Sequence, residues 1–311
     1  MYHFILNPTA ASGGGRKVWR KVKALLREYD IDYKLHIFDD KKALTECVKE
    51  LSNGQNGICN HIVVMGGDGT LNMVVNAIDN FNAVKLSCLK VGSGNDFARN
   101  VGVRKKAIRE LVHLIKKPEE ILLDVGEAVY LDEDDVRHVR RYLISSGIGY
   151  DADICEEAER SRLKKVLNKI KLGKLVYLFV GLKQVMTKKG SMALIYLDNK
   201  RIGIREMFFA VSMIHPMEGG GVPFCPYADP GDGKLDVCVV KIAKKPKLYL
   251  EVALVYLKKH LLFSNVKNYR VNNIRIVLAK PEWVHFDGET PSKVREIEHR
   301  CMKDSRLTFV K

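Results

Sequence analysis

Residues 62–78 restrict the fold more than any other stretch of this 311-residue chain. Residues 62–65 are a short apolar run of the kind that forms a buried strand, and three glycines around Asp68 follow it directly. Apolar residues then recur with the spacing of an amphipathic helix, at Leu71, Val74, Val75 and Ile78. Glycines at such a strand-to-helix turn let backbone N–H groups approach a phosphate at the positive end of the helix. Taken alone, the turn fits an ordinary strand–helix connection equally well.

Strands and helices alternate through the first 122 residues. We expect strands at 2–6, 33–38, 62–65 and 84–91, with helices at 16–29, at 43–51 and after the glycine turn. A second polar, glycine-containing turn at 92–98 follows the last of these strands. This alternation predicts an α/β domain in which helices cover both faces of a parallel sheet. Both turns should then lie at its carboxyl edge, where such sheets bind ligands.

The pattern changes near residue 123. Short strands are expected at 142–144, 192–197, 207–213, 235–240 and 274–278, interrupted by helical segments at 156–187 and 246–262. We therefore predict an α/β domain over 1–122 and a β-rich, sandwich-like domain over 123–290. The C-terminal segment, 291–311, should carry a strand at 306–310 that returns to one of the two domains.

Composition limits the compartment and the partners. The seven cysteines are scattered without a CxxC pair, which indicates neither a disulfide framework nor a zinc site and favours a cytoplasmic location. The first residues lack the features of a signal peptide, and the longest apolar run falls far short of a membrane span. The formal net charge of +15 indicates an anionic partner, which charge alone leaves open between nucleic acid, anionic lipid and nucleotide phosphate.

The motifs along the chain resemble those of a known enzyme family. Gly66-Gly67-Asp68-Gly69-Thr70 followed by Asn72 resembles the nucleotide-binding signature shared by diacylglycerol, sphingosine, ceramide and NAD kinases and 6-phosphofructokinases. Seven further motifs resemble those of bacterial diacylglycerol-kinase-type lipid kinases and occur in the same order: Asn7-Pro8, 92–99, 123–126, 147–152, 219–221, 226–237 and 287–289. The segments at 92–99 and 226–237 favour this lipid branch over NAD kinases.

The resemblance implies an ATP- and Mg²⁺-dependent kinase acting on the hydroxyl of a membrane lipid. It implies a set of ATP-binding residues: Asn7, Gly66, Gly67, Asp68, Gly69, Thr70, Asn72, Ser93, Asn95 and Asp96. Asp68 would position Mg-ATP, and we expect its side chain at a solvent-facing turn. Glu289 matches the family's general base, with Asp287 beside it, so the implied catalytic residues are Glu289, Asp68 and Asp287.

The resemblance also implies a magnesium site outside the reaction centre, at Asp229, Asp232 and Lys234. Lys234 could ligate only through its backbone carbonyl, because an ammonium cannot coordinate a cation. Without the other motifs, the segments at 230–233 and 287–289 would both be interpreted as surface turns. The chain departs from the family at the end of the second strand, at Ser93 in place of threonine, at 145–146, and at His215, which we interpret as a hydrogen-bonding replacement.

Two basic segments with apolar stripes, at 160–180 and 244–260, suit an anionic membrane surface. Each alone fits a helix that packs its stripe on the core, but with a lipid-kinase signature we expect peripheral binding at the inner membrane face. The leading function is phosphorylation of diacylglycerol to phosphatidic acid. A sphingoid base, ceramide or prenol as acceptor, and a catalytically inactive nucleotide-binding regulator, stay open. No nucleic-acid-binding pattern appears, and a homodimer is compatible with the sequence.

Overall fold

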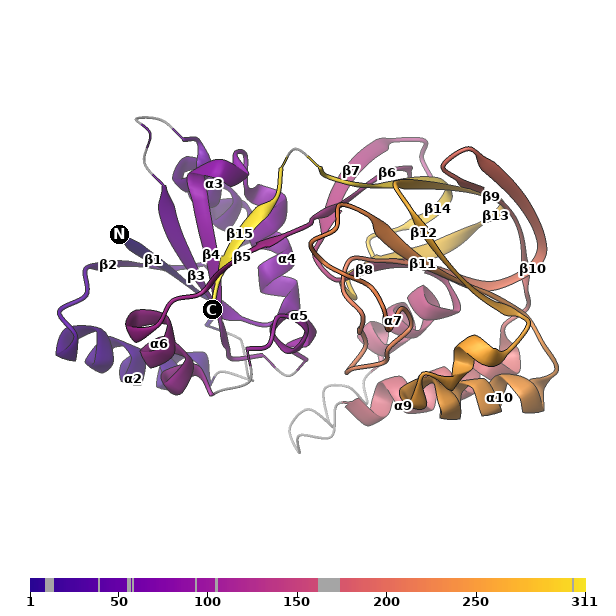
Figure 1. Cartoon of the computed structure of the whole chain (residues 1–311), viewed down its shortest axis with the longest axis horizontal. Helices are drawn as coiled ribbons and strands as arrows, with labels where there is room; N and C mark the ends of the chain where they lie inside the picture. The colour runs from indigo at the N-terminus through magenta and orange to yellow at the C-terminus, as the bar shows by residue number, and fades with distance from the viewer. Residues whose placement is uncertain are drawn as a thin grey trace. The chain divides into compact units, whose positions relative to one another are not determined.

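The computed structural model describes residues 1–8, 14–38, 40–54, 57, 59–92, 94–103, 106–161, 174–303 and 305–311. These residues form two compact units, Met1–Val125 together with Met302–Lys311, and Gly126–Cys301 (Figure 1). The sequence prediction placed the boundaries at 122/123 and 290/291. In the structure, residues 293–301 belong to the second unit because they form a strand, β14 (Lys293–Cys301), that pairs with two strands of that unit. Only the last ten residues return to the first unit.

The first unit contains a six-stranded, mostly parallel sheet in the order β2-β1-β3-β4-β15-β5. Five of its strands run parallel: β1 (Tyr2–Leu6), β2 (Tyr33–Ile37), β3 (Asn60–Gly66), β4 (Val84–Lys90) and β15 (Leu307–Val310). The edge strand β5 (Glu120–Leu123) pairs antiparallel with β15. The four strands predicted in this part of the chain are confirmed, and the predicted C-terminal strand lies between β4 and β5.

Helices cover both faces of this sheet, as predicted (Figure 1). One face packs against α2 (Gly15–Glu28) and α6 (Ala107–Lys116), whose apolar residues share a core with Phe4 and Met65. The other face packs against α3 (Lys41–Ser52) and α4 (Asp68–Ala77), with short turns at η2 (Phe81–Ala83) and α5 (Asp96–Asn100). Because successive side chains of a strand point to opposite faces, burial on both faces explains the continuous apolar run of the central strand β3.

The second unit is β-rich, as predicted, and its nine strands form one sheet that closes on itself. The strands are β6 (Gly126–Leu131), β7 (Arg137–Tyr142), β8 (Ser145–Gly149), β9 (Ser191–Leu197), β10 (Lys200–Met213), β11 (Leu235–Lys241), β12 (Val266–Val271), β13 (Asn273–Phe286) and β14. The long strands β10 and β13 each pair with both β8 and β9, so these four strands close a ring. Ile148, Ile195 and Phe286 are among the apolar residues that fill its core.

The helices of the second unit are α7 (Tyr150–Arg160), α9 (Lys174–Thr187) and α10 (Lys245–Leu254), followed by the single turns η3 (Val255–Leu257) and η4 (Lys259–Leu262). The helix predicted over 156–187 corresponds in part to α7 and α9, and residues 162–173 lie outside the described part of the chain. The strand predicted at 142–144 is a correction. Tyr142 ends β7, and only Leu143 and Ile144 form a bend between β7 and β8, because the Asp287 side chain, not a neighbouring strand, accepts their N–H groups.

Candidate active site

The two glycine turns of the first unit lie side by side at the carboxyl ends of the paired strands β3 and β4. The backbone N–H groups of Val91 and Gly92 donate to the carbonyl oxygen of Gly66, at 3.3 and 3.2 Å. A Cβ atom at Gly92 would lie only 2.5 Å from the Cα atom of Gly67. Glycine is therefore required for the two backbones to approach this closely.

Asp68 connects the two turns. One of its carboxylate oxygens accepts the N–H of Asp96 at 3.0 Å, and the other accepts the N–H of Phe97 at 3.1 Å. The carboxylate thus caps the first turn of α5. The residue is half-buried, so the turn that was expected to face solvent is partly enclosed, and its carboxylate is held by the backbone of α5. Asn95 stands just before α5 in the left-handed conformation (φ 53°), and its side-chain amide donates to Gly92 O at 2.6 Å.

Asn7 and Thr70 meet beside a small cleft. The Asn7 Nδ2 donates to Thr70 Oγ1 at 3.0 Å, which ties the end of β1 to the first turn of α4. The cleft has a volume of about 180 Å³ and is lined by Leu6, Asn7, Phe38, Asp40, Lys41, Leu44, Thr70 and Met73. Part of this lining comes from Phe38, Asp40 and Lys41, in the segment where the sequence departs from the family.

The remaining predicted nucleotide residues lie around the same edge. Asn72 is buried within α4, and its backbone carbonyl accepts the Asn76 amide at 2.8 Å. The Asp96 carboxylate pairs with Arg99 and is largely buried. The N-terminus of α4, which contains Gly69, has no side-chain cap, so its N–H groups and positive end suit a phosphate. Ser93 lies outside the described residues.

In the second unit, Asp287 and Gly288 form a tight turn between Phe286 and Glu289. Both central residues have positive φ, 50° and 89°, which is the type I′ geometry that asparagine, aspartate and glycine favour. The N–H of Phe286 donates to Glu289 O at 2.9 Å, and the N–H of Glu289 donates to Phe286 O at 3.0 Å. Sequence and structure agree on a turn at this point, and its geometry fixes the position of Glu289.

The two carboxylates of this turn have different surroundings. The Asp287 carboxylate accepts three backbone N–H groups, from Leu143 at 2.9 Å, Ile144 at 2.7 Å and Ser145 at 3.1 Å. Glu289 is half-buried, and its carboxylate has no hydrogen-bond partner among the described residues. Backbone N–H groups thus occupy the Asp287 carboxylate, whereas no described residue occupies that of Glu289.

The loop that was predicted to bind magnesium brings several carboxylates together. Asp229 accepts the Gly231 N–H and Asp232 accepts the Lys234 N–H, both at 3.0 Å, each through one oxygen. Burial raises the pKa of the neighbouring Asp236, the carboxylates of Asp232 and Asp229 add to this rise, and Arg270 opposes it. Mg²⁺ prefers oxygen ligands, so these carboxylates suit the ion in kind. In the structure, the Arg270 guanidinium pairs with Asp232 at 3.4 Å and with Asp236 at 3.5 Å.

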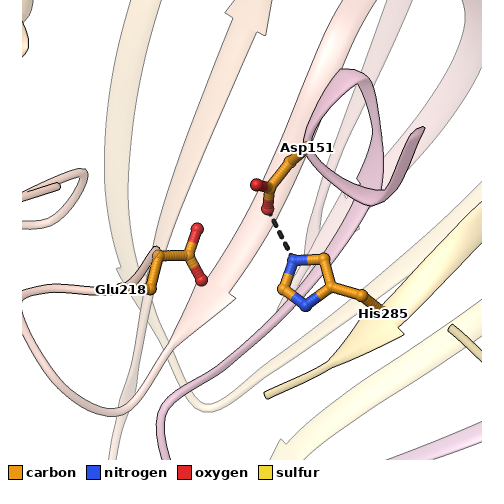
Figure 2. A group of neighbouring side chains, drawn as sticks. All are labelled: Asp151, Glu218 and His285. Carbon is orange, nitrogen blue, oxygen red and sulfur yellow. Dashed lines mark hydrogen bonds and ion pairs between the residues drawn. The ribbon is translucent and has the colours of Figure 1, made fainter. Parts of the chain in front are cut away.

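Sequence reasoning missed a buried cluster of Asp151, Glu218 and His285 (Figure 2). The His285 Nε2 lies 2.6 Å from Asp151 Oδ2, and the Ser145 hydroxyl donates to Glu218. Each of the three residues lies inside or next to a quoted motif: 147–152, 219–221 and 287–289. Their position in those motifs was the available signal, but nothing local indicated that the three side chains would meet.

The cluster has unusual electrostatics. Burial by itself lowers the pKa of His285, but the carboxylates, with Asp151 first, outweigh burial and raise it to about 9. Burial, reinforced by Asp151, raises the pKa of Glu218 well above its usual range. Nearby, burial lowers the pKa of His215 to about 3, which keeps that imidazole neutral at physiological pH.

Comparison with known proteins identifies the family. Residues 1–128 match the diacylglycerol kinase catalytic domain, and residues 144–301 match the YegS C-terminal NAD kinase beta sandwich-like domain. The chain belongs to the diacylglycerol-kinase-like family of lipid kinases. This confirms the resemblance drawn from the eight motifs, and it makes the protein a kinase of the lipid branch.

Relatives of this lipid kinase align over nearly the whole chain. It is 25% identical over 288 residues to "Putative lipid kinase YtlR" of Bacillus subtilis, covering 93% of each chain. It is 23% identical over 291 residues to "Diacylglycerol kinase" of the same organism, covering 92% of this chain and 88% of the relative.

Solved structures share the fold. A diacylglycerol kinase from Bacillus anthracis str. Sterne superposes with a TM-score of 0.71 at 20% identity, covering 99% of this chain and 96% of the other. An NAD kinase from Archaeoglobus fulgidus in complex with ATP superposes with a TM-score of 0.51 at 13% identity, covering 100% and 94%. At these identities the likeness shows the fold alone.

The lipid kinase also exposes four large apolar side chains in one segment of its second unit, Leu250, Tyr256, Leu257 and Leu262, with exposed fractions of 50%, 60%, 63% and 82%. We call these four residues the apolar ridge. Exposed lysines at 258 and 259 stand between them. The helix α10, which carries Leu250, is tied to α9, because the Tyr249 hydroxyl donates to Leu182 O at 3.2 Å. Within the described ranges, no helix is long and apolar enough to cross a bilayer.

Proposed function

We propose that this lipid kinase transfers the γ-phosphoryl group of ATP to the hydroxyl of diacylglycerol, producing phosphatidic acid. The observation that carries the proposal is the Glu289 carboxylate, which has no partner among the described residues and stands on a turn fixed by its neighbour Asp287. An alcohol that attacks a phosphoryl group must lose its proton, and a free carboxylate at a fixed position suits that task. The relative named diacylglycerol kinase, which aligns over 92% of the chain, supports diacylglycerol as the acceptor.

Nucleotide binding is assigned to the first unit. Backbone N–H groups at the start of α4 would hold phosphate, and Asn7 and Thr70 line the adjacent cleft. Asp68 would act mainly by holding the second turn in place, because both of its oxygens accept N–H groups of α5. Ser93 is retained in this proposal as a nucleotide contact on the strength of the motif alone.

Magnesium is assigned two places. One ion would accompany ATP and neutralise charge on the phosphates, which is where most of the acceleration of phosphoryl transfer arises. A second would be held in the second unit by Asp229, Asp232 and the backbone carbonyl of Lys234. The oxygen-only donor set and the crowding of carboxylates around Asp236 support this assignment.

The apolar ridge is the proposed contact with the membrane. Leucine and tyrosine side chains exposed beside lysines suit the boundary between acyl chains and anionic headgroups. We infer peripheral binding to the cytoplasmic leaflet. The other basic segment falls largely on residues 162–173, outside the described residues, and is retained from the sequence only.

The test is a lipid panel. The protein is incubated with labelled ATP, Mg²⁺ and anionic vesicles that contain diacylglycerol, a sphingoid base, ceramide or a prenol, and the labelled lipid is identified. We expect labelled phosphatidic acid from the wild type and at least ~100-fold less from Glu289→Gln. Label on another acceptor would replace diacylglycerol in the proposal. Bound ATP without any labelled lipid would favour an inactive nucleotide-binding regulator.

A further inference from the structure

Among the residues that the structure describes, three potential metal-binding side chains converge inside the second unit. The ligand atoms of Asp151, Glu218 and His285 all lie within 4.8 Å of one another. Asp151 lies in the first turn of α7, Glu218 in the loop after β10, and His285 on β13. Figure 2 shows Glu218 directed from its loop toward the other two side chains. Because β8 pairs with both β10 and β13, the sheet itself brings these elements together.

All three side chains of this cluster are largely buried, which raises the free-energy cost of any polar atom left without a partner. The His285 side chain is 2% exposed, Asp151 13%, and Glu218 5% as a whole residue. One Glu218 oxygen accepts the Ser145 hydroxyl, whereas the other, Oε1, is buried and has no hydrogen-bond donor among the residues that the structure describes. A buried carboxylate oxygen without a partner costs free energy. A cation at this point would pair with that oxygen and so remove the cost, and its positive charge would lie between the two carboxylates.

The backbone at Gly147 approaches the ligand atoms closely. Gly147 stands directly opposite His285 in the pairing of β8 with β13. A Cβ atom at Gly147 would lie 2.5 Å from His285 Nε2 and would also collide with the Asp151 carboxylate. Any side chain at this position would therefore fill the space where the ligand atoms meet.

We propose that Asp151, Glu218 and His285 bind a divalent first-row transition-metal ion, for which Zn²⁺ and Co²⁺ are suitable probes. Two carboxylates with a neutral imidazole carry a charge of −2, which one divalent ion balances in a buried setting. Imidazole is a ligand of zinc-like ions, whereas Mg²⁺ prefers oxygen, so this site differs from the Asp229–Asp232 loop. The proposal does not depend on which lipid is phosphorylated.

Binding requires a small rearrangement. Zinc–ligand distances of about 2.0–2.2 Å place two ligand atoms of a tetrahedral site ~3.4 Å apart. The His285 and Asp151 atoms, now 2.6 Å apart, would separate by less than ~1 Å. The imidazole would keep one proton, on Nδ1, and give up its long hydrogen bond from the Gly288 N–H, which measures 3.3 Å. Both carboxylates would bind without protons, and surplus protons would pass to solvent.

The experiment uses the full chain without ATP or Mg²⁺. The protein is stripped with EDTA, loaded with Zn²⁺ or Co²⁺ and gel-filtered, and bound metal is measured by mass spectrometry and by the visible spectrum of protein-bound Co²⁺. We expect one tightly held equivalent in the wild type. Glu218→Gln and His285→Gln should each weaken binding by more than the ~10–100-fold that loss of an outer-shell partner costs.

Two matched variants serve as controls. His260→Gln alters another buried histidine of the same unit, and Asp232→Asn alters the magnesium loop, and both should keep the equivalent of metal. Asp151→Asn provides a third ligand variant if either of the first two fails to fold by circular dichroism. The melting temperature of the wild type should rise with Zn²⁺ and fall with EDTA. A wild type that retains no metal, or ligand variants that retain as much as the wild type, would overturn the proposal in favour of a proton-sharing cluster.

Discussion

The Asp287–Glu289 turn allows a direct test, because replacing one of its two carboxylates should reduce stability and replacing the other should reduce turnover. Asp287 accepts three backbone N–H groups at 2.7–3.1 Å, whereas Glu289 has no partner among the described residues. Replacing Asp287 should therefore reduce the stability of the second unit. Replacing Glu289 by glutamine should leave its stability within about 0.5 kcal/mol and reduce turnover instead.

The loss of unfolding free energy expected on replacing Asp287 follows from the contacts of its carboxylate. A hydrogen bond to a charged group contributes about 1.5–3 kcal/mol, although three bonds to one carboxylate do not add fully. Alanine at a position with φ of 50° adds about 1 kcal/mol of strain, so we expect Asp287→Ala to cost about 3–5 kcal/mol. Asparagine tolerates this φ, and its amide oxygen can keep the bonds to Ile144 and Ser145. Asp287→Asn should therefore cost only about 1–3 kcal/mol.

The chain offers a built-in reporter for the assay. Its two tryptophans lie in different units, Trp19 on α2 and Trp283 on β13. In a Trp19→Phe background, urea unfolding followed by fluorescence reports the second unit alone. Asp287→Ala should lower the urea midpoint of this transition and, in a thermal scan of the same background, lower its melting temperature by roughly 6–20 °C. Glu289→Gln should keep the wild-type transition and ATP affinity while turnover falls ~10²–10⁴-fold, or about 3–5 kcal/mol of barrier.

Two results would refute this reasoning. If Asp287→Ala unfolds at the wild-type urea concentration, its carboxylate does not hold the 143–145 bend. If Glu289→Gln turns over normally, Glu289 is not the base, and Asp68 or Asp287 becomes the candidate.

Four further predictions address other parts of the molecule. Asp68→Ala should abolish activity and, because it uncaps α5, destabilise the first unit by about 1–3 kcal/mol, measured by calorimetry; an unchanged melting temperature would contradict the capping role. Asp232→Ala should lose both activity and the rise in melting temperature that Mg²⁺ gives the wild type, and an equal Mg²⁺ response in both proteins would remove the ion from this loop. Leu257→Asp should weaken sedimentation with anionic vesicles ~10–100-fold, whereas Val136→Asp, at a similarly exposed apolar position, should not; equal losses would argue against the apolar ridge. Burial lowers the pKa of His299 to about 3, so the unfolded chain binds a proton at this histidine before the folded chain does as the pH falls below about 6.5. The free energy of unfolding should therefore drop toward pH 3 by at most ~1.4 kcal/mol per pH unit. His299→Gln should flatten this slope in urea titrations at pH 7.5 and 5, and an unchanged slope would exclude the histidine as its cause.

Several features of this lipid kinase were determined by the sequence itself. The apolar runs of β1 to β4, their intervening helices and the two glycine turns depend on periodicity and turn chemistry within a few residues. The turn at 287–288 is likewise local, because aspartate and glycine favour positive φ. The order of the motifs was enough to indicate the family, which the comparisons confirm.

Other features were decided only by the tertiary structure. Residues 293–301 belong to the second unit because β14 pairs with β6, which is far away in the chain. The Asp68 and Asp287 carboxylates accept backbone N–H groups of residues that are distant in sequence. Asp151, Glu218 and His285 meet because β8 pairs with β10 and β13 in one particular register. Pairing register and burial depend on the whole core at once, so no local pattern could reveal which polar groups would be enclosed together or which of them would lack a partner.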